Sequence, residues 1–203
     1  MPDKKRILIT GRAKWPKLNE PDAFKPGDTP YYKVDLILTP EEAKPIIAQL
    51  EEAYEAGYQY HLNKEGKARL KKSSTRPWFE EEEKDGSLTG QMIFRCKARG
   101  ENRDGCKLSL LVVDSATKPM TEQVGGGSLL RVAVDPYVWF VGAHGVGISL
   151  QMAGVQVLEL HGGASPRTAE GCGFTAEEGF ETASAAMATA PVGTDEDDAG
   201  DDF

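Results

Sequence analysis

Alternation of apolar and polar side chains along short segments is the feature that most limits what this chain can fold into. Residues 31–38 and 91–99 both have a period of two, which is typical of strands that bury one face. In residues 31–38, Tyr31 and Lys33 fall on the polar face. In residues 91–99 the polar face carries Arg95, Lys97 and Arg99. We expect further strands at residues 6–15, 107–114, 129–141 and 146–160.

A helix is predicted directly after the strand at 31–38. Thr39 can cap it, Pro40 fits the first helical position, and Glu42 completes a capping box. Apolar residues then recur every three or four positions as far as Tyr54, which predicts one buried face. Gly57 is the expected end of the helix.

Five or six strands with one helix inserted after the second predict a mainly β fold, and an OB-fold-like barrel is the best match. We expect this domain to span residues 1–163 and to carry a basic and then acidic insertion at 58–90. Residues 17–30 contain three prolines and are expected to form a loop.

The formal charge of −8 is unevenly distributed along the chain. Residues 165–203 hold ten acids and one base, a net charge of −9, which leaves 22 acids and 23 bases, a net charge of +1, in residues 1–164. The segment after residue 163 is rich in Ala, Gly, Ser, Thr and Glu. We therefore expect residues 164–203 to be a disordered acidic tail.

Several classes of protein are disfavoured by what the sequence lacks. It has no P-loop, H-E-x-x-H or G-x-S-x-G motif, so we expect no enzyme and no cofactor. Cys96, Cys106 and Cys172 form no C-x-x-C pair, which predicts free thiols of a cytoplasmic protein and no metal site. No apolar run is long enough for a membrane span, and the N-terminus does not resemble a signal peptide.

Cations and aromatic residues occur together on the predicted strands, as they do in proteins that bind single-stranded nucleic acid through phosphate contacts and base stacking. An ordinary solvated face is the alternative for the cations, and core or rim packing is the alternative for the rings. Of Trp139 and Phe140, one should be buried and the other free. The candidate DNA-binding residues are Arg12, Lys14, Trp15, Tyr31, Lys33, Lys71, Lys72, Arg76, Trp78, Arg95, Lys97, Arg99 and Trp139.

The last nine residues contain six acids and end in an aromatic residue. The carboxylates can imitate phosphates and compete for the protein's own basic face, and the terminal ring can enter an apolar pocket on a partner. A merely solubilising terminus is the simpler alternative. The residues of this motif are Asp195, Glu196, Asp197, Asp198, Asp201, Asp202 and Phe203.

Two regions resemble the OB-fold single-stranded DNA-binding proteins encoded by tailed bacteriophages. One region is the N-terminal stretch with Gly11-Arg12-Ala13, Pro16, Leu18, Pro21 and Tyr32-Lys33-Val34, and the other is the acidic tail closed by Phe203. The resemblance spans residues 5–162 and the last nine. It implies a protein of DNA replication, recombination and repair in the host-cell cytoplasm. Such a protein would coat single strands and contact a polymerase or helicase–primase through its tail.

Two other functions remain as alternatives. The first is a phage structural or assembly protein whose basic patch is incidental. The second is a small metal-dependent nuclease, which would need clustered carboxylates beside a basic face. The sequence leaves open the oligomeric state, with a homodimer as one option. It also leaves open the choice between DNA and RNA, the binding of duplex, and which rings stack on bases.

Overall fold

The computed structural model describes residues 5–23 and 25–162. The long helix follows the second strand, as expected, and the strands expected at 31–38 and 129–141 have those bounds. In chain order the elements are β1 (Ile7–Asp22), β2 (Tyr31–Leu38), α1 (Pro40–Glu65), β3 (Trp78–Glu82), β4 (Leu88–Arg99), β5 (Val112–Val113), β6 (Leu129–Val141) and β7 (Gly145–Glu159).

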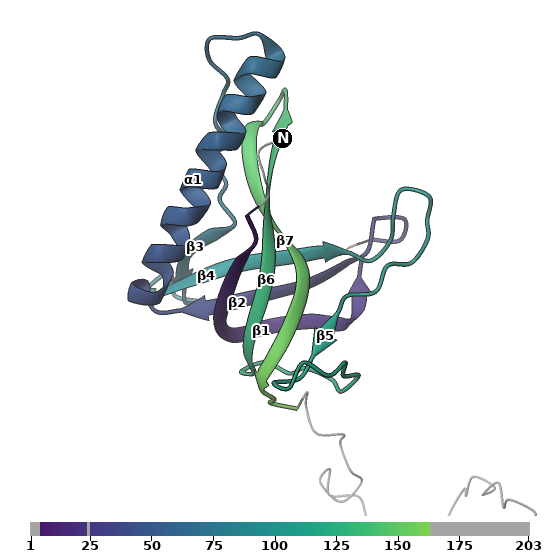
Figure 1. Cartoon of the computed structure of the whole chain (residues 1–203). Helices are drawn as coiled ribbons and strands as arrows, with labels where there is room; N and C mark the ends of the chain where they lie inside the picture. Colours follow the sequence, from purple (N-terminus) through teal and green to yellow (C-terminus); the bar gives the residue numbers. More distant parts are fainter. Residues whose placement is uncertain (1–4, 24, 163–203) are drawn as a thin grey trace, which may run out of the picture. The chain divides into compact units, whose positions relative to one another are not determined.

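The strands close into a barrel (Figure 1). They follow the order β3-β4-β2-β1-β6-β7-β5, and an additional pairing joins β4 to β7. That joint is parallel, with Cys96 opposite Leu150 and Lys97 opposite Gln151. Strands β1, β2, β4, β7 and β6 therefore form a closed five-stranded barrel, while β3 and β5 extend it at the edges. The expected OB-fold-like barrel with a helix after the second strand is confirmed.

Alternate residues of the barrel strands fill its interior. Val34 and Leu36 of β2, Phe94 of β4 and Val132 of β6 are fully buried. The residues between them in β2 and β4 are mostly more exposed, as the alternation read from the sequence predicts, with Asp35 and Ile93 as buried exceptions. Burial of these apolar side chains is the main source of the barrel's stability.

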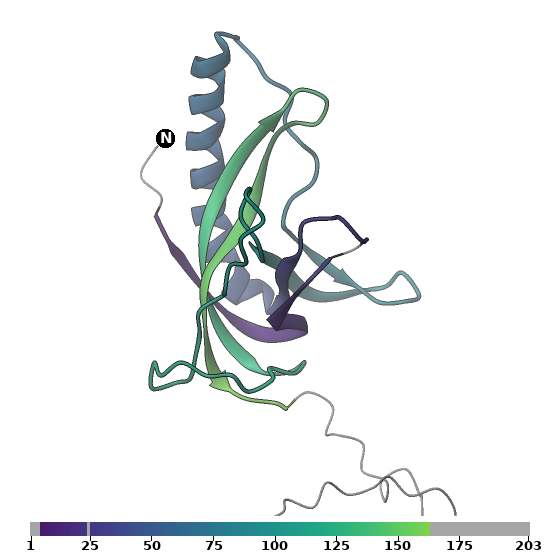
Figure 2. The ribbon, with the colours of Figure 1, turned by 90° about the vertical axis from the view of Figure 1, so that its right-hand side faces the viewer.

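Helix α1 begins as predicted and ends later than predicted. The Thr39 hydroxyl accepts the Glu42 backbone N–H at 3.4 Å, and the Glu42 carboxylate accepts the Thr39 N–H at 3.0 Å. The helix continues past Gly57 to Glu65 and is capped by Gly66, whose φ is +61°. Gly57 instead permits close packing, because a Cβ there would lie 2.5 Å from the Cβ of Val138 in β6. Figure 2 shows α1 alongside the β6–β7 hairpin.

The first strand departs from its expected end at residue 15. It continues through Pro16 to Asp22, across an irregularity in its pairing with β2 between Lys14 and Lys17. Proline is tolerated at such a bulge because no ladder hydrogen bond is required of it there. Trp15 has a φ of +49°, which marks the same bend.

Other expected segments differ in extent or lie outside the described residues. The strand expected at 107–114 is confined to β5, and the insertion at 58–90 contains the end of α1 and all of β3. Cys96 is buried and Cys106 is exposed, both as free thiols. Cys172 and the predicted tail at 164–203 are not among the described residues. Within residues 5–23 and 25–162, no helix is long and apolar enough to cross a membrane.

Candidate nucleic-acid interface

The outer faces of β2 and β4 carry a shared row of polar side chains. The antiparallel register sets Tyr31 opposite Arg99, Lys33 opposite Lys97, and Asp35 opposite Arg95. Side chains of directly opposed residues are neighbours on one face of a sheet. The two polar faces read from the sequence therefore form one surface across both strands.

Lys97 of β4 and Tyr31 of β2 lie close together on this surface. The Lys97 Nζ lies 5.2 Å from the centroid of the Tyr31 ring, within the range of a cation–π contact. Lys97 and Arg99 are both exposed, and neither pairs with a carboxylate among the described residues. Lys33 is partly neutralised, because its Nζ lies 3.1 Å from Asp22.

Arg95 is held by the carboxylate of Asp35. Its Nε and Nη2 donate to the two carboxylate oxygens at 3.2 and 3.1 Å, and Asp35 is 8% exposed. The hydrogen bonds that Arg95 donates to Asp35 raise the pKa of Arg95, so its guanidinium stays charged. The guanidinium carbon lies 5.1 Å from the centroid of the Phe79 ring in β3. Arg95 is therefore a fixed cation with an aromatic neighbour.

Trp15 stands at the β1 edge of the same surface. Trp15 is 70% exposed, and the Lys14 Nζ lies 4.6 Å from the centroid of the Trp15 ring. Lys14 also pairs with Glu81 of β3, whose other oxygen accepts the Thr89 hydroxyl at 3.0 Å. The hydrogen bond from Lys14, and to a smaller extent that from Thr89, lowers the pKa of Glu81.

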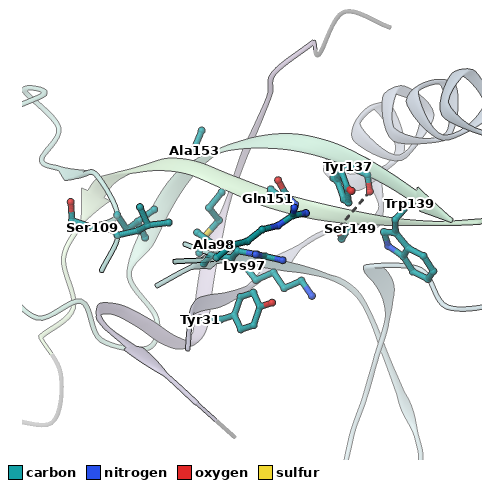
Figure 3. Close-up of a pocket in the computed structure, with 14 residues that line it drawn as sticks. Tyr31, Lys97, Ala98, Ser109, Tyr137, Trp139, Ser149, Gln151 and Ala153 are labelled. Carbon is teal, nitrogen blue, oxygen red and sulfur yellow. Dashed lines mark hydrogen bonds between the residues drawn. The ribbon is translucent and has the colours of Figure 1, made fainter. Parts of the chain in front are cut away.

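Two neighbouring cavities join these residues into one groove. The first is lined by Trp15, Tyr31, Lys33 and Arg95 as well as Lys97. The second also includes Tyr31 and Lys97 and continues over β6 and β7 (Figure 3). We call the combined surface the groove, and it runs from Trp15 to Trp139. Arg99, Tyr137 and Gln151 also line it.

Trp139 lies at the β6–β7 end of the groove (Figure 3). Its indole crosses Gly147, where a Cβ would come within 2.2 Å of the ring, so only glycine leaves room for it. Phe140 points to the other side and packs against the core, with its ring 6.1 Å from His61. The two rings thus lie on opposite faces of β6, as the alternation predicted, but neither is fully buried or fully exposed: Phe140 is partly buried against the core, and Trp139 is half-buried along the groove.

Several candidate residues lie elsewhere. Trp78 is 8% exposed and faces the core, so it does not line the groove. Its neighbour Phe79 is 37% exposed and contacts Arg95. Arg12 pairs with Glu159 at 3.4 Å and lines neither cavity. Phe79, Tyr137 and Gln151 were not among the candidates, although strand alternation places Phe79 on the face opposite Trp78.

The basic residues of the insertion are also outside the groove. Lys72 pairs with Glu55 at 3.0 Å, and its Nζ lies 4.5 Å from the Tyr58 ring centroid. The Arg76 guanidinium lies 4.2 Å from the Tyr54 ring centroid. These two cations therefore attach the segment after α1 to the helix. Lys71 is exposed.

Comparison with solved structures identifies the fold. The gp2.5 single-stranded DNA-binding protein encoded by bacteriophage T7 superposes with a TM-score of 0.63 and 22% identity, over 90% of this chain and 100% of that one. The chain shares its fold with this phage protein. The single-stranded DNA-binding protein of bacteriophage Enc34, in complex with single-stranded DNA, has the same fold at a TM-score of 0.58 and 14% identity. That match covers 79% of this chain and 89% of the Enc34 chain.

Comparison at the level of sequence gives no relative. No protein-family model matches the chain, and no curated protein does either. The fold is thus shared at identities of 22% and 14%, where sequence similarity is faint.

Proposed function

We propose that this chain binds single-stranded DNA, without catalysis and with little preference for sequence. The observation that carries the proposal is the groove, in which exposed cations and aromatic rings alternate over four barrel strands. Phosphate-binding cations beside stacking rings are the two parts that single-strand binders combine. The fold shared with two phage proteins described as single-stranded DNA-binding supports the same choice.

Each part of the groove has a separate role in this proposal. Lys33, Lys97 and Arg99 contact phosphates, and each neutralised phosphate contributes about −0.7 to the log–log salt slope on a single strand. Tyr31 and Trp15, with Trp139 at the far end, stack on bases at roughly 1–3 kcal/mol per base. Stacking accepts any base, which is why we propose sequence-tolerant binding.

The cellular role is a further part of the proposal. Coating of single strands suits DNA replication, recombination and repair, in the host-cell cytoplasm if the chain is encoded by a phage. Residues 195–203 would recruit a polymerase or helicase–primase and would also compete with DNA for the groove. This part is supported by the acidic sequence ending in Phe203 and not by the described residues.

Fluorescence anisotropy with labelled oligothymidine tests the proposal, with a matched duplex as the comparison. We expect binding to the single strand below the micromolar range, with affinity that falls as salt is added. A phage assembly protein with an incidental basic patch would form ordered oligomers and leave the anisotropy unchanged. That result would overturn the proposed function.

A further inference from the structure

A basic segment follows α1 and is fixed against the tip of the β6–β7 hairpin. The Val146 N–H donates to the Lys71 carbonyl at 2.8 Å, and the Ser73 N–H donates to the Val146 carbonyl at 2.8 Å. Leu70 is buried, and its carbonyl accepts the Tyr58 hydroxyl at 2.9 Å. The segment is therefore held in place by both the hairpin and the helix (Figure 2).

The cations of this segment fall into two groups. Lys72 and Arg76 are paired with Glu55 and Glu51 of α1 and lie over tyrosine rings, so they have structural roles. The other group is exposed and pairs with no carboxylate in the described part of the chain. This group, which we call the outer cations, consists of Lys67, Arg69 and Lys71.

The charge of the outer cations is not balanced by nearby acids in the sequence. Residues 61–76 contain six Lys and Arg and a single acid, Glu65. Like charges on a fixed segment repel one another, and a polyanion that contacts all of them relieves this repulsion. The anchors at Leu70 and Lys72 hold the outer cations together whether or not a ligand is present.

The outer cations are located next to the end of the groove. A Cβ on Gly145 would lie 2.3 Å from the Lys71 carbonyl oxygen, so the backbones of segment and hairpin touch. Two residues further along β7, Gly147 lies beneath the Trp139 indole. A strand that leaves the groove past Trp139 thus meets Lys71 next.

We propose that Lys67, Arg69 and Lys71 form a second phosphate-binding site, which holds the backbone of the same single strand after it has left the groove at Trp139. The inference rests on the proposed function and adds a site outside the barrel. It predicts that a long oligonucleotide gains contacts that a short one cannot reach.

The test compares a triple charge reversal, K67E/R69E/K71E, with a matched reversal, K44E/K84E/K118E. All six lysine and arginine residues are exposed, none pairs with a carboxylate among the described residues, and both variants have the same net charge. Affinity is measured for oligothymidines from about 4 to about 24 nucleotides, a range that begins at the small end of OB-fold site sizes and extends beyond it.

We expect the two variants to bind the shortest oligonucleotides equally well. Beyond a threshold length, K67E/R69E/K71E should bind on the order of tenfold more weakly than the matched variant. The log–log salt slope of its binding should also be smaller in magnitude by about 2. Two results would overturn the second site. One is equal affinity of the two variants at every length, and the other is a loss of affinity in K67E/R69E/K71E, relative to the matched variant, that is the same for short and long oligonucleotides. If the unchanged protein binds no oligonucleotide, the proposed function itself fails.

Discussion

Lys97 of β4 holds its Nζ 5.2 Å from the centroid of the Tyr31 ring on β2, and both residues line both cavities of the groove. A base that stacks on Tyr31 would bring its own phosphate within reach of this ammonium group. The pair therefore combines stacking and charge neutralisation at one place, which is the physical basis of the proposed function.

Replacing Tyr31 by alanine tests the stacking half of that pair. We expect Y31A to weaken oligothymidine binding by about 1–3 kcal/mol, or roughly 5- to 150-fold, because one base loses its stacking partner. The salt slope should not change, since no cation is removed. Tyr60 of α1, which is half-buried and lines neither cavity, provides the control. If Y60A lowers the affinity as much as Y31A, Tyr31 has no special role.

Two adjacent aromatic residues of β3 should behave in opposite ways. Trp78 is buried, so W78A should lower the free energy of unfolding by about 3–5 kcal/mol, as removal of a large core side chain does. Phe79 contacts Arg95 on the groove side, so F79A should weaken DNA binding with much less effect on stability. Urea unfolding and anisotropy of each variant measure both quantities. Loss of affinity without loss of stability in W78A would contradict the assignment of faces.

Glu81 should make the stability depend on pH in the acid range. Its pKa is lowered by the hydrogen bonds from Lys14 and Thr89. A carboxyl with a lowered folded-state pKa stabilises the fold above its unfolded-state pKa, and this contribution disappears as the pH falls through the folded value.

The free energy of unfolding of the unchanged protein should therefore exceed that of E81Q near neutral pH. The difference should shrink as the pH is lowered from about 7 to about 2, since E81Q has no group to protonate at this position. Chemical denaturation of both proteins over this range measures it. A difference that stays constant with pH would show that the Lys14–Glu81 pair contributes nothing through ionisation.

Removal of residues 195–203 tests the role proposed for the acidic end. If its six carboxylates compete with phosphates for the groove, the shortened chain should bind oligothymidine more tightly, most clearly at low salt where charge interactions are least screened. Binding to replication partners should be lost. A variant in which the six acids are replaced by Asn and Gln separates charge from length. Unchanged or weaker DNA binding after the deletion would rule out competition.

Much of the groove could be predicted from local sequence. The period of two placed Lys97 and Arg99 on one face of β4 and Tyr31 on the matching face of β2, because side chains alternate along any strand. The start of α1 could also be predicted, because the hydrogen bonds of the capping box at Thr39 all lie within four consecutive residues.

Features that depend on distant contacts could not be predicted. Gly57 resembles a helix stop until Val138, far along the chain, is seen to pack on it. The bend at Trp15 and Pro16 depends on pairing with β2. Trp78 was predicted as the binding ring of β3, yet it is buried, and Phe79 is the ring that contacts Arg95; the consecutive glutamates that make up the rest of β3 hide its alternation. The neighbourhood of Trp139 and Tyr31 arises only from the closure of the barrel between β4 and β7.

The salt dependence of oligothymidine binding tests the central claim most directly. The unchanged protein and the double variant K97Q/R99Q are titrated by anisotropy at a series of salt concentrations, and the logarithm of the association constant is plotted against that of the salt concentration. For an oligothymidine too short to reach the outer cations, the account predicts a slope of about −2 for the unchanged protein and a slope smaller in magnitude by about 1.4 for the variant, one phosphate contact being lost per cation. Binding that does not respond to salt, or equal slopes for the two proteins, would contradict it.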